Sequence, residues 1–381
     1  MHPIFTLLSL VTLTFAVSTA SAHGPDGAKH QMVQLGDMTL ESGAVVKNLN
    51  MSYTSHGTLN AAKDNAILVL HPFGGNHHGF DGMIGPGKAL DTDKYFIIAP
   101  DQFGSTQVGF DHSTSPTDSG MKMNFPPYNH RDMIQAQHKL VTEGLGLRHL
   151  RAVLGISMGA THALQYAVMH PDFMDAIVPI AGVPVYGNEA FLIMTQVQAI
   201  IENCAAWQGG NYTENSTECA GTALWNLANY FFSREWWDAN IRTQAEFDGF
   251  RKRWSEVYFG VQDMRDLYYL AKTFGRSAIA ATPGFKGDLN AALQSIKAKT
   301  MFIYSPKDMF FLPKQVEQAA AQIKHAQVVA INADAGHLIC CGVDPQAYWI
   351  MGEVIRGLLE GLNSRTAAKS LLVLAPCRIS Q

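Results

Sequence analysis

The sequence contains little charge, few cysteines and, after its first residues, no apolar run long enough to cross a bilayer. Only 16% of the 381 residues are charged, and the net charge of -4 with a pI near 6.4 leaves no marked excess of either sign. This balance gives no electrostatic basis for binding nucleic acid or an anionic membrane surface. We therefore expect a small, neutral or mildly polar substrate, with no nucleic-acid partner and no membrane span.

The N-terminal residues have the pattern of a secretory signal peptide. An apolar run over residues 4–17 is followed by Ala20, Ser21 and Ala22, a small-residue cleavage site, and cleavage would fall before His23. A membrane anchor is the alternative, but a run of about 14 residues is short for a span. We therefore predict a cleaved signal peptide over residues 1–22 and a secreted or periplasmic protein.

Export gives the five cysteines a different meaning, because disulfides persist outside the cytosol. Cys204 and Cys219 flank a polar segment with two N-glycosylation patterns, at Asn211 and Asn215, and a third pattern begins at Asn50. We predict a Cys204–Cys219 disulfide that closes a surface loop. Glycosylation is expected only in a eukaryotic secretory pathway.

Two further groups of residues could bind metals or respond to oxidants. His71, His77 and His78 are close in sequence, but no carboxylate or cysteine ligand pattern accompanies them, so we favour histidines that cap loops. Cys340 and Cys341 are adjacent, and small apolar packing is the favoured interpretation over redox control. We therefore expect neither a metal nor an organic cofactor.

Hydrophobic residues make up 47% of the chain, enough for a large core in one α/β domain with an insertion. Short apolar strands alternate with helices, which indicates a doubly wound, mostly parallel sheet. The predicted strands are 38–41, 45–53, 66–70, 95–99, 150–156, 176–180, 300–304 and 326–331. The predicted helices are 132–143, 158–170 and 346–361.

The pattern changes between residues 184 and 287, where short apolar strands are absent and five of the six tryptophans occur. We predict a helical cap over residues 185–289, with most tryptophans packing it onto the core and one or two facing substrate. The predicted order is the signal peptide (1–22), first core part (23–184), cap (185–289), second core part (290–365) and tail (366–381).

A nucleophile motif stands between a strand and a helix. Residues 155–159 read GISMG, the G-x-S-x-G pattern, and Ser157 separates the predicted strand 150–156 from the predicted helix 158–170. The flanking glycines allow a sharp turn, which forces the serine backbone into a disfavoured conformation at a cost of roughly 1–3 kcal/mol. Because a serine hydroxyl is a weak nucleophile at neutral pH, a base must accompany it.

Ser157, Asp308 and His337 occur in the order Ser, Asp, His, each after a predicted strand. His337 would take the serine proton during attack on a carbonyl and return it to the leaving group, while Asp308 orients the imidazole. The alternative is that Asp308 caps a helix and His337 is an ordinary loop residue. Other acids that could be the third member are Asp101, Asp132 and Asp334.

Acyl transfer also needs two backbone donors for the developing oxyanion. The residue after the nucleophile, Met158, would supply one, and the loop after strand 66–70 would supply the other. Pro72 has no N–H, so Phe73 is the better candidate in that loop.

Several separate segments resemble one enzyme family. They are residues 83–91 (MIGPGKALD), 95–96 (YF), 157–159 (SMG) and 207–212 (WQGGNY), with the loops of Asp308 and His337. Through them, residues 65–361 resemble the homoserine O-acetyltransferase-like branch of the α/β-hydrolases. The resemblance implies an α/β-hydrolase fold with an inserted helical cap, and an acyl-serine intermediate on Ser157.

This branch contains acetyltransferases and relatives that pass the acyl group to water. The transferases need an arginine for the acceptor carboxylate, which Arg234, Arg242, Arg251 and Arg253 do not clearly supply, and Ala160 replaces a usual glycine. Export would also remove a transferase from cytosolic acyl-CoA. We predict a secreted serine hydrolase of a carboxylic ester or similar small acyl compound; the alternatives are acyl transfer to homoserine or another hydroxyl, and a non-catalytic binding protein.

Overall fold

A computed structural model describes residues 30–104, 112–258, 261–275 and 279–362. The predicted signal peptide and the predicted tail lie outside these residues. Within the described ranges, no helix is both long and apolar enough to cross a membrane.

The core is an eight-stranded sheet, in the order β1-β4-β6-β5-β7-β8-β9-β10. Strands β1 and β6 pair with β4 in antiparallel fashion, whereas all other neighbours are parallel. The strands are β1 (Gln31–Gln34), β4 (Asn50–His56), β5 (Ala66–Leu70), β6 (Phe96–Pro100), β7 (Leu150–Ile156), β8 (Met174–Ile180), β9 (Lys299–Tyr304) and β10 (Ala326–Ala330). The predicted doubly wound, mostly parallel sheet is confirmed.

One predicted strand is wrong. Residues 45–53 do not form a single strand, because Asn48 has a left-handed backbone with φ of 51° that interrupts it. Val45–Val46 (β3) instead pairs with Met38–Thr39 (β2) as a separate two-stranded sheet, and β4 starts at Asn50.

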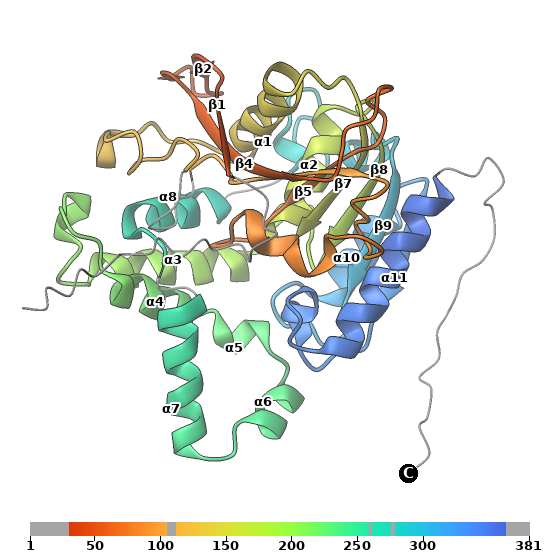
Figure 1. Cartoon of the computed structure of the whole chain (residues 1–381). Helices are drawn as coiled ribbons and strands as arrows, with labels where there is room; N and C mark the ends of the chain where they lie inside the picture. Colours follow the sequence, from red (N-terminus) through yellow and green to blue (C-terminus); the bar gives the residue numbers. More distant parts are fainter. Residues whose placement is uncertain (1–29, 105–111, 259–260, 276–278, 363–381) are drawn as a thin grey trace, which may run out of the picture.

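Helices cover both faces of the sheet (Figure 1). α1 (His130–Lys139), continued by a π-turn (Leu140–Gly144), packs with α2 (Met158–Met169) and α10 (Pro313–Ala320) on one face. α11 (Pro345–Gly361) and the 3-10 segment η1 (His77–Met83) cover the other. Neighbouring residues of β5 face opposite sides, so Leu68 joins the first core and Ile67 the second.

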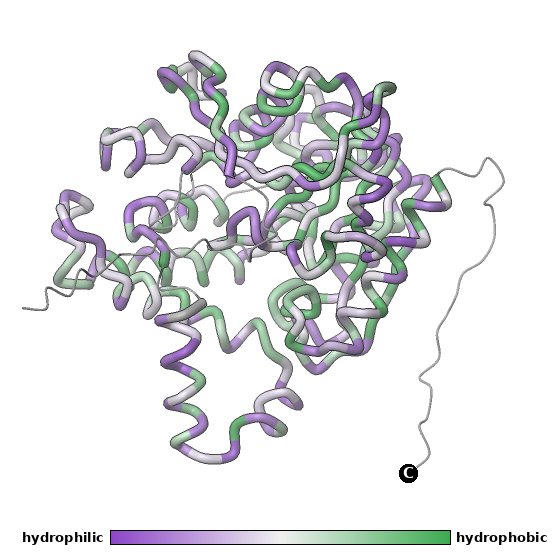
Figure 2. The backbone as a smooth tube through the Cα atoms, viewed as in Figure 1, coloured by the Kyte–Doolittle hydropathy of each residue, from purple (hydrophilic) through white to green (hydrophobic). Residues whose placement is uncertain are grey.

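Between β8 and β9 the described chain forms helices without a further strand. These are α3 (Asn188–Glu202), η4 (Gln208–Gly210), α4 (Thr217–Trp225), α5 (Ala228–Phe231), α6 (Arg234–Asn240), α7 (Gln244–Lys252), η5 (Arg253–Tyr258), α8 (Met264–Phe274), η6 (Ile279–Ala281) and α9 (Leu289–Gln294). In Figure 1, α3, α4 and α8 group at one end of the sheet, while α5, α6 and α7 extend from it as an arm. Figure 2 shows the contrast in hydropathy between the apolar sheet strands and the largely polar α7.

Aromatic rings pack the arm together with the neighbouring α4 and η5. The members of this cluster are Trp225, Phe232, Trp236, Trp237, Phe250 and Trp254. Their rings contact one another at centroid distances that include 3.9 Å between Phe232 and Trp236. We therefore assign the four tryptophans of this cluster to packing.

Candidate active site

The turn from β7 into α2 holds Ser157 in a strained conformation. Its φ of 53° and ψ of -113° lie in a region that L-residues rarely adopt, at a cost of roughly 1–3 kcal/mol. A Cβ on Gly155 would lie 1.9 Å from the carbonyl oxygen of Gly159, and a Cβ on Gly159 would lie 2.1 Å from that of Leu70. Both glycines are therefore required for the strand and the helix to pass this closely.

Ser157, His337 and Asp308 form one hydrogen-bonded chain. Nε2 of His337 lies 2.9 Å from Oγ of Ser157, and Nδ1 of His337 lies 2.9 Å from Oδ2 of Asp308. All three residues are buried. Segments 180 residues apart in sequence thus meet at one edge of the sheet, the arrangement in which a histidine can deprotonate a serine.

The second carboxylate oxygen of Asp308 has a structural task. Oδ1 accepts hydrogen bonds from the backbone N–H groups of Phe310 and Phe311, at 2.8 and 3.0 Å. The helix-capping alternative for Asp308 is wrong, because the helix that follows, α10, has Leu312 at its N-cap; one oxygen of Asp308 instead binds a turn, while the other meets His337. Two fixed oxygens leave the carboxylate little freedom to rotate away from the imidazole.

Aromatic rings that the sequence analysis did not single out surround the imidazole. Phe231, at the end of α5, stacks on His337 with a centroid distance of 4.8 Å, and Phe310 and Phe311 lie at 5.0 and 5.4 Å. Gly336 allows the cap to approach, because a Cβ there, at φ of 58°, would come within 2.9 Å of the Phe231 carbonyl. Two of the three rings come two and three residues after Asp308, a signal the sequence did contain.

The two predicted oxyanion donors lie on adjacent segments. Met158 is the first residue of α2, so its N–H has no carbonyl partner within the helix. Phe73 follows β5, the strand beside β7 in the sheet. The start of α2 lies against this loop, because a Cβ on Gly159 would come within 2.8 Å of the His71 carbonyl. Both donors therefore flank the edge of the sheet that carries Ser157.

The other acids considered as third members have different partners. Asp101 accepts from Nδ1 of His77 at 2.9 Å, and Asp132 closes the N-terminal capping box of α1. Asp334 forms an ion pair with the ammonium group of Lys307. Asp308 is the acid that the structure places against His337.

Cys340 is the last residue of the 3-10 segment η7 (Gly336–Cys340), which contains His337, and Cys341 follows it. Their Sγ atoms lie 3.3 Å apart, and Cys340 is buried. The hydrogen bond with Cys341, together with burial, raises the pKa of Cys340 well above its ordinary value. The burial of Cys340 is consistent with its predicted packing role.

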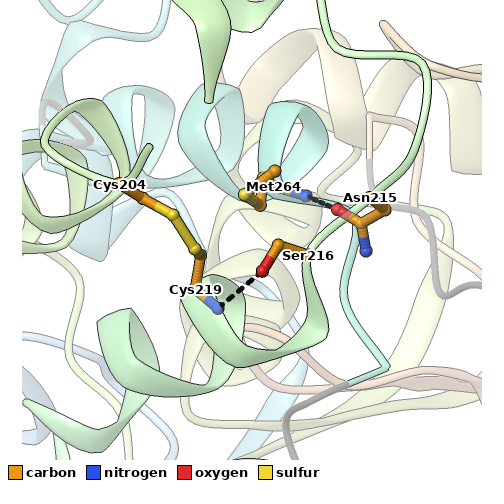
Figure 3. The surroundings of a disulfide bond; sticks show 5 residues. All are labelled: Cys204, Asn215, Ser216, Cys219 and Met264. Carbon is orange, nitrogen blue, oxygen red and sulfur yellow. Dashed lines mark hydrogen bonds between the residues drawn. A yellow bond between two sulfur atoms is a disulfide. The ribbon is translucent and has the colours of Figure 1, made fainter. Parts of the chain in front are cut away.

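The predicted disulfide joins Cys204 and Cys219, with Cα atoms 6.2 Å apart (Figure 3). The enclosed segment is not purely a surface loop, because the Trp207 and Tyr212 side chains are buried in the cap. Asn215 also has structural contacts: its Nδ2 donates to the Gln262 carbonyl and its Oδ1 accepts from Met264 N–H.

The three glycosylation patterns differ in exposure. Asn211 is exposed, Asn50 starts the sheet strand β4, and the amide of Asn215 is used within the fold as described. Glycosylation remains a prediction, and Asn211 is the position where the side chain is accessible.

The arginines named as possible carboxylate ligands all lie on the surface. They are Arg234, Arg242, Arg251 and Arg253. The buried arginine of the cap is Arg265, a residue the sequence analysis did not consider. Its guanidinium donates to the Gly210 carbonyl at 2.8 Å and to Thr117 Oγ1 at 2.9 Å, and it lies 4.2 Å from the Tyr212 ring centroid. Arg265 is thus engaged in holding the cap together.

Comparison with known proteins agrees with this architecture. A family model described as the alpha/beta hydrolase fold matches residues 65–341. An ethyl acetate hydrolase of Pseudomonas veronii is 32% identical over 341 residues, which cover 86% of this chain and 93% of the relative. A homoserine O-acetyltransferase of Nautilia profundicola is 30% identical over 338 residues, which cover 78% of this chain and 90% of that enzyme.

A solved structure extends the likeness to three dimensions. The acetyl esterase MekB matches with a TM-score of 0.79 and 29% identity, over 87% of this chain and 97% of that one. The similar proteins thus include ester hydrolases and acetyltransferases, so the reaction is ester hydrolysis or acyl transfer. The chain belongs to the α/β-hydrolase family of enzymes, in its homoserine O-acetyltransferase-like branch.

Proposed function

We propose that this protein is a secreted serine hydrolase that cleaves a carboxylic ester, or a similar small acyl compound, through an acyl-Ser157 intermediate. The observation that carries the proposal is the hydrogen-bonded chain from Asp308 through His337 to Ser157, with each bond at 2.9 Å. A binding protein of this fold would need neither the strained serine nor its aligned base.

In the first half of the reaction, Oγ of Ser157 attacks the carbonyl carbon while Nε2 of His337 takes its proton. Asp308 stabilises the imidazolium that forms, and the N–H groups of Met158 and Phe73 stabilise the oxyanion. His337 then protonates the leaving alcohol. In the second half, His337 takes a proton from the water that attacks the acyl-serine, and it returns this proton to Oγ of Ser157 as the acid leaves.

Water is the favoured acceptor because, within the described cap, no buried arginine is left uncommitted for an amino-acid carboxylate. The four arginines on the arm and its flanks are exposed, and Arg265 is bound to Gly210, Thr117 and Tyr212. The signal-peptide pattern supports the same choice, because acyl-CoA is a cytosolic compound. Acyl transfer to homoserine or another hydroxyl remains the second candidate, supported by the acetyltransferase relatives.

The surroundings of His337 favour a small acyl group. Phe231, Phe310 and Phe311 crowd the imidazole within centroid distances of 5.4 Å and are themselves buried. Rings packed this closely favour an apolar group of few atoms over a long chain. The similarity to an ethyl acetate hydrolase and an acetyl esterase supports acetate esters as first substrates to test.

The test is the dependence of turnover on an acceptor. Purified protein is given an acetate ester, with or without homoserine, and in parallel acetyl-CoA with homoserine. We expect acetate release from the ester at a rate that homoserine leaves unchanged. Turnover that requires both acetyl-CoA and homoserine would replace hydrolysis by acyl transfer.

A further inference from the structure

Three histidines from two distant segments of the chain come together outside the catalytic site. His30 directly precedes β1, and His77 and His78 start η1. One ring nitrogen from each lies within 4.8 Å of the others. The ring centroid of His77 lies 4.5 Å from that of His30 and 4.2 Å from that of His78.

This cluster differs from the one considered in sequence. His71 does not belong to it, because its Nε2 accepts the Gln102 N–H at 3.1 Å and its Nδ1 lies 2.9 Å from the Pro72 carbonyl. His30 takes its place, from a position 47 residues before His77. Such a separation is not among the short spacings by which metal ligands are recognised in a sequence.

Carboxylate groups orient two of the three rings through hydrogen bonds at their Nδ1 atoms. Nδ1 of His77 lies 2.9 Å from both oxygens of Asp101, and Nδ1 of His78 lies 2.6 Å from Oδ2 of Asp81. Asp101 is itself fixed by the Ser52 hydroxyl at 2.8 Å. A carboxylate on Nδ1 sets the tautomer in which Nε2 is the metal-binding atom, and it raises the basicity of that atom.

We propose that His30, His77 and His78 form a binding site for one Zn²⁺ ion. Three imidazole ligands suit Zn²⁺ and exclude the hard cations Mg²⁺ and Ca²⁺, which prefer oxygen. Zinc–nitrogen bonds of about 2.0–2.1 Å require the three nitrogens to draw closer than 4.8 Å, and a water molecule completes the tetrahedron. His30 and His78 are only partly buried, so their side chains can make this adjustment.

The ion would link the start of the described chain to the segment that follows β5. Among the described strands, β1 lies at the edge of the sheet and has β4 as its single neighbour, so its attachment would gain from a second link. The proposal does not depend on the reaction at Ser157, because none of the three histidines belongs to the hydrogen-bonded chain described there. Its expected effects are on zinc affinity and thermal stability.

The experiment is calorimetric titration of Zn²⁺ into tag-free, chelator-treated protein, with the melting temperature followed in parallel. We expect one Zn²⁺ per chain and a melting temperature that rises with Zn²⁺ concentration. His30→Gln and His78→Gln should each weaken affinity at least about tenfold, and Asp81→Asn by about 10–100-fold. The matched control His325→Gln alters an exposed histidine and should bind as the wild type does.

His77 is left intact in these variants because it is buried against Asp101 and its loss could unfold the segment. Co²⁺ provides an independent measurement, since four-coordinate Co²⁺ bound by imidazole absorbs in the visible range. Absence of saturable Zn²⁺ binding to folded wild-type protein would overturn the proposal. Wild-type affinity in both His30→Gln and His78→Gln would overturn it equally, because the ion would then lie elsewhere.

Discussion

The carboxyl edge of the sheet and the helical cap above it are built on different principles. At the sheet edge, each residue of the proposed triad lies in the segment after a strand, and backbone geometry sets the position of the nucleophile, as at Ser157 and its two glycines. In the cap, helices hold together through aromatic rings, one disulfide and the buried Arg265. In the proposed function, the sheet edge therefore sets the catalytic geometry, and the cap is the region that would select the acyl group and the acceptor.

The two regions meet at His337. Phe231 of the cap stacks on its ring, and the backbone N–H of Ser233 donates to the Asp334 carbonyl at 3.3 Å. A change in the sheet edge should therefore abolish turnover without unfolding the protein, whereas a change in the cap should alter stability or selectivity first. The following predictions test this division.

The largest effect is expected at the nucleophile. Ser157→Ala should lower kcat by about 10⁶-fold with binding of the ester largely retained, because the covalent step is removed. Steady-state kinetics with an acetate ester measure this loss. The control Ser295→Ala, on a partly buried helix end remote in sequence, should keep kcat within about threefold. Substantial residual turnover by Ser157→Ala would contradict the assignment.

Asp308 and Asp334 provide a matched pair of acids on neighbouring loops. Asp308→Asn should lower kcat by about 10⁴-fold, because the amide orients His337 in the wrong tautomer. Asp334→Asn removes only the surface ion pair with Lys307 and should leave kcat within about threefold. Equal losses in the two variants would show that Asp308 does not act through the imidazole.

Removal of the cap disulfide should lower the free energy of unfolding and leave kcat little changed. The bond closes a loop with a sequence separation of 15, for which the chain-entropy model gives about 3 kcal/mol. The double variant Cys204→Ser and Cys219→Ser should lose about that much free energy of unfolding in urea, with kcat little changed. Cys341→Ser is the control, since that thiol is free in the structure. A kcat that falls in the double variant but not in Cys341→Ser would mean that the cap also positions the triad.

A buried histidine pair at the boundary should make stability depend on pH. Nε2 of His162, on α2, lies 3.1 Å from Nδ1 of His130, on α1, and the His130 ring also contacts Tyr186 and Phe274 of the cap. Burial lowers the pKa of His130 from 6.5 to about 3, and burial lowers that of His162 well below 6.5. The unfolded chain therefore binds protons that the folded protein does not, between about pH 6.5 and 3.

Stability should accordingly fall as pH decreases through that window, by about 1.4 kcal/mol per pH unit for each histidine. His130→Gln should reduce the dependence of the free energy of unfolding on pH by about 1.4 kcal/mol per pH unit. Urea titrations at pH 7, 6 and 5 measure this dependence. His325→Gln, on the surface, serves as the control. An unchanged slope in His130→Gln would show that this pair is not the source of the pH dependence.

The sequence predicted the sheet edge far better than the cap. Strands β5 and β7 have the bounds that were predicted, because runs such as AILVL are apolar on both faces and end in turn residues. The order Ser157, Asp308, His337 was also available, since each follows a strand. Local patterns therefore determine most of the sheet and the members of the site.

The packing of the cap, and its contacts with the rest of the protein, depend on residues that are far apart in sequence. Local patterns do not encode such contacts. Arg265 forms a hydrogen bond with Thr117, which lies 148 residues earlier in the sequence. Phe231, within the insertion, stacks on His337, which lies after it. The histidine cluster is a further case: the sequence groups His71 with His77 and His78, whereas the fold brings His30 to His77 and His78. Only tertiary structure shows which of fifteen histidines meet.

The most direct measurement of the central claim is labelling with a fluorophosphonate, read out by peptide mass spectrometry. We predict one covalent adduct on the peptide that contains Ser157, formed rapidly by the wild type, very slowly by His337→Ala and not at all by Ser157→Ala. Folded wild-type protein that stays unlabelled, or that carries the adduct on another residue, would contradict the account.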